Sequence, residues 1–180
     1  MSVGALLAWL EEQAKAWILG SRDAHRPLAQ MLHADVRAHY EPFFEGRELD
    51  VARWRVVPVI EDPPFVAEAE MRGIPRGIEF SRMAGITFQD TVLLSEREMP
   101  SNPEGLVFHE LIHVVQYELL GVEEFVRQYI RGFLAGGLRY ETIPLERDAY
   151  ELQARFESGE GAFSVKRELQ RRWAAGEGRA

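Results

Sequence analysis

Apolar residues recur at helical intervals near the N-terminus. In residues 3–19 the apolar positions fall on one face, which predicts an amphipathic helix that Gly20 is expected to end. Ser21 or Asp23 would then cap a second helix from about residue 24 to residue 44. This spacing predicts a helical N-terminal part over residues 1–46.

The middle of the chain has a different pattern. Residues 54–60 are short and β-branched, which predicts a strand, and Pro58 places it at a sheet edge or a bulge. Residues 84–88 and 91–94 are two further strand candidates around a Gln89-Asp90 turn. Residues 72–82 are rich in glycine and proline and are expected to form a loop. A sheet region over 52–96 follows from these segments.

Helical spacing returns in the last third, over residues 102–175. The predicted helices cover 103–120, 122–135, 144–157 and 164–173, and Gly121 separates the first two. Helical segments before and after a short sheet region in the sequence indicate an α+β fold with a small, twisted, mostly antiparallel sheet. The 180 residues fit one domain, and no linker or internal repeat divides them.

Composition and charge exclude several classes of function. The net charge of −8 disfavours nucleic-acid binding, because an acidic surface repels phosphate backbones. The absence of cysteine excludes disulfides, thiolate metal sites and a cysteine nucleophile. The apolar stretch Met1–Leu10 is too short to span a bilayer and lacks the features of a secretory signal. We therefore expect a cytoplasmic protein without membrane contacts.

One motif carries candidate chemistry, His109-Glu110-Leu111-Ile112-His113, within the predicted helix 103–120. Residues four apart share a helix face, so both imidazoles can bind one metal ion. Glu110 is rotated by about 100° from His109, where it can act on water without binding the metal. Zinc is the ion that this spacing indicates. The alternative is that both histidines are ordinary buried or surface residues.

A catalytic zinc site needs a third protein ligand. No histidine follows His113, so a carboxylate on a later helix is expected. Of the candidates Glu141, Glu146, Asp148 and Glu151, we favour Glu146. It lies in the first turn of the helix that Pro144 begins, where the helix dipole stabilises a carboxylate, and its neighbours Leu145 and Ala149 are apolar.

The motif and the downstream glutamate resemble the gluzincin branch of zinc metallopeptidases. The stretch His109–Gln116 is also similar to the H-E-L-x-H-V-x-Q helix of metallopeptidase domains linked to bacterial contractile injection systems. The similarity covers about residues 84–157. Two features depart from the common gluzincin pattern: Tyr150 stands where an aspartate is usual, and the helix 122–135 lengthens the interval between His113 and Glu146.

The resemblance implies a zincin-like fold in which His109, His113 and Glu146 bind Zn²⁺ and Glu110 is the general base. It also implies an edge strand above the metal on which a peptide substrate adds as a further strand, for which residues 84–88 are the candidate. A tyrosine often stabilises the oxyanion in such enzymes; Tyr150 and Tyr140 are the candidates, and the alternative for each is a buried aromatic residue without that role. Gln116 and Tyr117 are expected to pack or hydrogen-bond near the site.

Together these features predict a zinc-dependent metallopeptidase that cleaves peptide or protein substrates. Two alternatives remain. The chain could be a zinc-stabilised binding or assembly module without turnover, or a helical scaffold that binds no metal. The oligomeric state stays open, because the apolar stripe of 122–135 suits a partner as well as a core.

Overall fold

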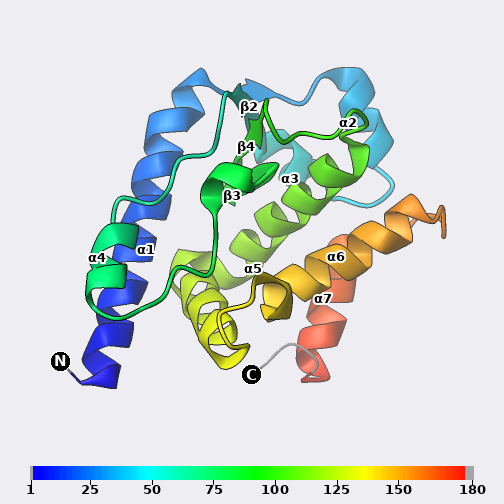
Figure 1. The fold of residues 1–180 in the computed structure, drawn as a ribbon. Coiled ribbons are helices and arrows are strands. Elements are labelled where there is room, and N and C mark those ends of the chain that lie inside the picture. Colours follow the sequence, from blue (N-terminus) through cyan, green and yellow to red (C-terminus); the bar gives the residue numbers. More distant parts are fainter. Residues whose placement is uncertain (1, 177–180) are drawn as a thin grey trace.

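The fold is α+β, with helices around a small sheet (Figure 1). The computed structural model describes residues 2–176. In chain order its elements are α1 (Val3–His25), η1 (Arg26–Leu28), β1 (Gln30–Met31), α2 (Ala34–Tyr40), α3 (Gly46–Val51), β2 (Arg53–Val57), α4 (Val66–Met71), η2 (Phe80–Arg82), β3 (Gly85–Phe88), β4 (Thr91–Ser95), α5 (Glu104–Ala135), η3 (Tyr140–Thr142), α6 (Pro144–Glu157) and α7 (Val165–Ala174).

The sheet has four strands in the order β1-β2-β4-β3. β1 pairs with β2 and β3 pairs with β4 in antiparallel fashion, whereas β2 and β4 run parallel. The sheet is therefore mixed: two of its three pairings are antiparallel, in agreement with the prediction, whereas the parallel pairing of β2 with β4 was not predicted. The turn between β3 and β4 lies at Gln89, whose φ of 60° suits a tight hairpin. The predicted hairpin of residues 84–88 and 91–94 is confirmed.

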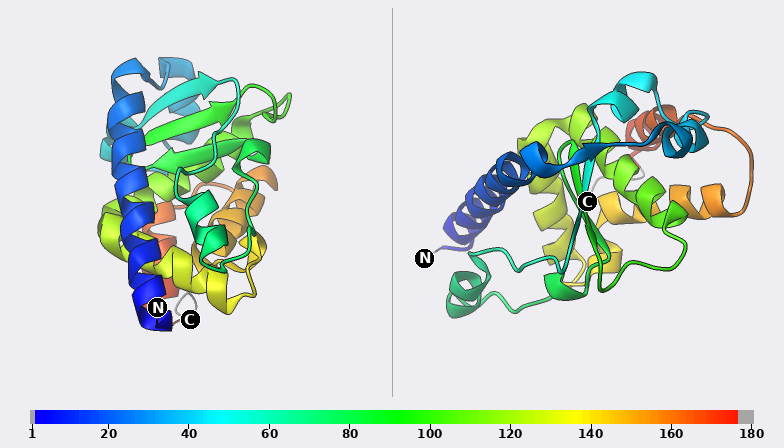
Figure 2. Two further views of the ribbon diagram at one scale, coloured as in Figure 1. Left: turned by 60° about the vertical axis from the view of Figure 1, so that its left-hand side comes forward. Right: turned by 90° about the horizontal axis from the view of Figure 1, so that it is seen from above.

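Helices cover both faces of the sheet, with α1 on one side and the first half of α5 on the other (Figure 2). β4 is buried along its whole length. Its Val92 and Leu94 pack in the cluster that contains the first half of α5, and Leu93 between them packs in the cluster that contains α1. This alternation follows from the opposite directions of successive side chains in a strand.

The N-terminal region differs from its prediction. α1 continues through Gly20 to His25, and the single helix expected over 24–44 is wrong. In its place lie η1, β1 and α2. The physical reasons are tertiary: Arg22 forms an ion pair with Asp90 at 2.8 Å, which holds the end of α1 on the β3–β4 turn, and Gln30 pairs with Trp54 in the sheet.

The last third follows its prediction closely. α5 contains both predicted helices, and Gly121 interrupts its helical geometry with φ 71° and ψ 165°. α6 begins at Pro144 and α7 follows Ser164, which caps it by accepting a hydrogen bond from the Arg167 backbone. The predicted loop 72–82 contains only the short turn η2, while α4 had not been predicted. Within residues 2–176, no helix is both long and apolar enough to cross a membrane.

Candidate metal centre

Three donor atoms meet between α5 and α6. His109 and His113 lie one turn apart on the first half of α5, and Glu146 lies in the first turn of α6. The Nε2 atoms of the histidines are 3.1 Å apart, and Glu146 Oε2 lies 3.2 Å from His109 Nε2 and 3.5 Å from His113 Nε2. None of the three residues is more than 5% exposed. The structure therefore brings together the two histidines and the carboxylate that the sequence indicated.

Two glutamines decide which imidazole nitrogen carries the proton. Gln116 Oε1 lies 2.8 Å from His113 Nδ1, and Gln153 Oε1 lies 3.0 Å from His109 Nδ1. Each amide is oriented by a second bond, because Gln116 Nε2 donates to the Leu145 carbonyl and Gln153 Nε2 donates to Glu157. The Nδ1 atoms must then be the donors, which leaves both Nε2 atoms of the neutral rings with lone pairs.

This arrangement fits a metal ion. Two imidazole lone pairs and a carboxylate oxygen face one another in a buried space, and a shared cation relieves their mutual repulsion. Bonds of about 2.0–2.1 Å in a tetrahedral zinc site would hold neighbouring donor atoms about 3.4 Å apart. The observed separations of 3.1, 3.2 and 3.5 Å bracket that value. Imidazole and carboxylate suit several first-row ions, zinc among them.

The charges at the site respond to burial and to one another. Burial alone would raise the pKa of Glu146, but the charges and hydrogen bonds of His113 and His109 outweigh it and lower that pKa below its ordinary value. Burial would likewise lower the pKa of His113, but the carboxylate of Glu146 outweighs it and raises the pKa to about 9. A positive charge between these groups is thus strongly favoured.

Tyr129 holds the other oxygen of Glu146. Its hydroxyl donates to Glu146 Oε1 at 2.8 Å, which leaves Oε2 facing the histidines. Tyr129 lies on the second half of α5, beyond the break at Gly121. The change of direction at Gly121 therefore places a residue of the same helix on the far side of the carboxylate.

Glu110 is fixed by the edge strand β3. Thr87 Oγ1 lies 2.6 Å from Glu110 Oε2 and donates to it, and it is also 3.1 Å from the Glu110 backbone carbonyl. Gly85 gives the carboxylate room, since a Cβ atom there would lie 2.5 Å from Glu110 Oε1. Burial raises the pKa of Glu110, although the neighbouring His113 and His109 oppose that rise. A buried carboxyl beside the three donor atoms has the character of a proton acceptor.

The predicted tyrosines lie at different depths. The ring of Tyr150 is 4.6 Å from the ring of His109 and about half exposed, so it stands on the solvent side of the site. Tyr140 lies on the buried side, where burial and then its neighbours Tyr129 and Glu146 raise its pKa well above the ordinary value. Tyr117 is buried and stacks on Phe125. Gln116 bonds directly to His113 within the site.

The other carboxylate candidates point elsewhere. Asp148 is buried, but its carboxylate accepts hydrogen bonds from Arg172 and Trp173 of α7. Glu151 is exposed and pairs with Arg172. Glu141 is exposed and lies 3.9 Å from Arg139.

Four residues around the site were not singled out from the sequence for their roles: Gly85, Thr87, Tyr129 and Gln153. Gln153 carried a usable signal, because it lies seven positions after Glu146 and thus on the same helix face. Thr87 belongs to an ordinary strand pattern and Tyr129 to an ordinary amphipathic helix pattern. Neither pattern indicates that the hydroxyl group has a role in the site.

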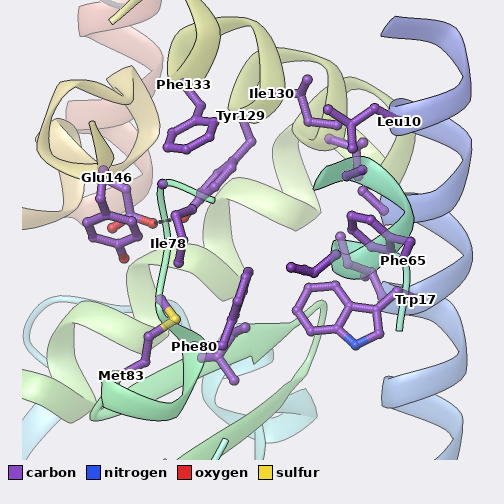
Figure 3. A pocket seen from close by; sticks show the side chains of 18 of the residues that line it. Leu10, Trp17, Phe65, Ile78, Phe80, Met83, Tyr129, Ile130, Phe133 and Glu146 are labelled. Carbon is purple, nitrogen blue, oxygen red and sulfur yellow. Dashed lines mark hydrogen bonds between the residues drawn. The ribbon is translucent and has the colours of Figure 1, made fainter. Parts of the chain in front are cut away.

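The site opens into a pocket of about 170 Å³. The Glu146 carboxylate and the Tyr129 hydroxyl meet at one end of it, and Leu10, Trp17 and Phe65 line the other (Figure 3). Glu110 also lines the pocket. One border of the cavity is therefore polar, and the opposite border is apolar.

Comparisons with protein-family models, with curated proteins and with solved structures gave no significant match.

Proposed function

We propose that the protein is a zinc-dependent hydrolase of peptide bonds. The observation that carries this proposal is the position of Glu110, which lines the same pocket as His113 and Glu146 and is anchored by Thr87. When bound, zinc supplies Lewis-acid polarisation of a carbonyl oxygen and lowers the pKa of water.

In this proposal Glu110 takes the proton of the attacking water and gives it to the leaving amine. Burial raises the pKa of this carboxyl, which makes it a better proton acceptor than an exposed glutamate. Tyr140 from the buried side and Tyr150 from the solvent side are the candidate donors to the developing oxyanion.

The free edge of β3 supports a peptide as the substrate. Ser95 N donates to Ala84 O at 2.8 Å, and the alternation of an antiparallel ladder then turns the backbone groups of Gly85 and Thr87 away from β4. Within residues 2–176, no strand pairs with this side of β3. An extended peptide can use these groups, and Thr87 would set it next to Glu110.

The test compares the wild type with Glu110→Gln on a mixture of unstructured peptides, with cleavage followed by mass spectrometry. We expect both proteins to hold about one zinc per chain, and we expect the variant to lose at least about 100-fold in cleavage rate. Glutamine keeps the shape of the side chain but cannot accept the proton. Cleavage by the variant at the wild-type rate would contradict the role of Glu110. Bound zinc without cleavage of any peptide would favour a binding or assembly module instead.

A further inference from the structure

The pocket beside the candidate metal centre has an apolar far end built from four separate parts of the chain. Its walls come from α1, from the segments around Phe65 and Phe80, and from the second half of α5. The indole of Trp17 lies at the centre of this wall, with ring centroids 6.3 Å from Phe65, 5.4 Å from Phe80 and 5.0 Å from Phe88, all edge to face. Such edge-to-face pairs are a favourable arrangement of aromatic rings and make the wall apolar.

The volume of the pocket limits what it can hold. A cavity of about 150 Å³ lined by apolar side chains is known to accept benzene. The whole pocket, with its polar end included, measures about 170 Å³, so its apolar part has room for one ring or one branched aliphatic group.

The charged groups at the rim of the far end are already paired. Arg76 lies 2.8 Å from Asp62 and 3.4 Å from Glu70, and Arg76 and Glu70 both border the pocket. Arg76 and Glu70 thus offer no free counter-charge to a charged ligand group, and the loss of hydration of such a group would oppose binding at this end.

The two faces of β3 connect the pocket with the reactive end. Thr87 turns its hydroxyl to Glu110, while Phe88, the next residue, packs on Trp17. A peptide paired with the free edge of β3 alternates in the same way, so that one residue faces the Glu110 side and its neighbour faces the Trp17 side.

From this geometry we propose that the pocket is a specificity site for a single large apolar side chain, of the size of leucine, methionine or phenylalanine, adjacent to the bond that is cleaved. This inference rests on the proposed hydrolysis of peptides. Binding of the side chain itself, however, requires no turnover, and so it can be tested separately.

The direct test titrates the zinc-loaded wild type with N-acetylphenylalaninamide, N-acetylalaninamide and N-acetylglutamic acid amide, with binding followed by NMR. We expect the phenylalanine derivative to bind at least about tenfold more tightly than the other two. The loss of an apolar group that fills an apolar pocket lowers affinity by about this factor or more. Equal affinity for the three compounds, or no binding at all, would overturn the pocket as a specificity site whether or not any peptide is cleaved.

A variant pair locates the binding. Ala14 lines the pocket from α1, whereas Ala16 is exposed on the same helix. Ala14→Phe should fill the cavity and abolish binding of the phenylalanine derivative, and Ala16→Phe should leave it within about twofold of wild type. If Ala14→Phe does not fold, as judged by its thermal transition, Ala14→Leu replaces it and should weaken binding at least about tenfold. Unchanged affinity in the folded Ala14 variant would overturn the assignment.

If cleavage is found, kcat/KM for matched peptides that differ at one position adds a second readout. We expect phenylalanine or leucine next to the cleaved bond to exceed alanine at least about tenfold in the wild type, and this preference to fall in the Ala14 variant but not in Ala16→Phe. Cleavage with equal kcat/KM for all of these peptides would overturn the specificity role while leaving the hydrolase proposal intact.

Discussion

The chemistry of the candidate centre depends on which nitrogen of each imidazole is free. The side-chain oxygens of Gln116 and Gln153 each accept a hydrogen bond from the Nδ1–H group of a histidine. The lone pair of the other ring nitrogen, Nε2, then points towards Glu146. The amides are held in turn by Leu145 and Glu157, so a change several residues away can alter the donor set. The donor set of such a site therefore depends on the hydrogen-bond partners of the histidines as well as on the histidines themselves.

We predict that Glu146→Ala weakens zinc binding more than 100-fold, since loss of a direct ligand should exceed the roughly 10–100-fold effect typical of the partners of ligands. Glu151→Ala is the matched control. That carboxylate is on the same helix but exposed and paired with Arg172, so zinc affinity should stay within about twofold. Competition against a chromogenic chelator measures both affinities. Equal affinities in the two variants would show that Glu146 is not a ligand.

Single residues of the site could be predicted to different degrees. The spacing of His109, Glu110 and His113 is enough to place them together on any helix. Glu146 could be selected because Pro144 fixes where α6 begins and therefore which side chain occupies the first turn. Tyr129 could not be predicted as a site residue, because its side chain reaches the site only through the break at Gly121. The local sequence does not determine the angle of that break.

At the level of elements, Gly121 is the position on which the site and the pocket both depend. Its φ of 71° with ψ of 165° belongs to a region that is almost restricted to glycine. The break separates the half of α5 that carries the histidines from the half that carries Tyr129 and the apolar wall. A straight α5 would carry Tyr129 away from Glu146.

We predict that Gly121→Ala lowers the free energy of unfolding by about 1–3 kcal/mol. Gly20→Ala is its counterpart, because Gly20 lies inside the helix α1, and a methyl group added there would have no neighbouring atom within 4 Å. That change should raise the free energy of unfolding by about 0.5–1 kcal/mol. Urea titrations of both variants measure these two changes in the free energy of unfolding, which we expect to have opposite signs. If Gly121→Ala raised the free energy of unfolding instead, the folded protein would not need the break in α5 at this position.

Elements were predictable where local signals act alone. α6 and α7 begin at a proline and a serine cap, and the β3–β4 hairpin is set by a short turn. The region 24–44 failed because contacts distant in sequence override its helical spacing, above all the pairing of Gln30 and Met31 with β2. The parallel pairing of β2 with β4 also has no short-range signal, since the two strands are joined through α4 and β3.

For the molecule as a whole, the buried cluster of three facing donor atoms should connect metal binding with folding. Without a metal ion, this cluster holds the charges of Glu146 and of protonated His113 away from water, which costs free energy. The unfolded chain has no such cluster. Any ion that binds only the folded form therefore raises stability by mass action.

We predict that zinc at 100 times its Kd raises the free energy of unfolding by about 2.7 kcal/mol, and that a chelator removes this increment. Urea unfolding with and without zinc measures it. Glu146→Ala should show a much smaller increment at the same zinc concentration. A zinc effect of equal size in that variant would place the ion elsewhere on the protein.

Tyr129 takes part in two arrangements at once, since its hydroxyl holds Glu146 while its ring borders the pocket. A side chain that packs against the ring restricts the same torsion angles that aim the hydroxyl. If both are occupied as proposed, the pocket and the metal centre share this side chain, and any coupling between them is reciprocal: each ligand changes the affinity of the other by the same factor. A peptide that tightens the hold of the protein on the metal would then itself be bound less tightly by the protein depleted of metal.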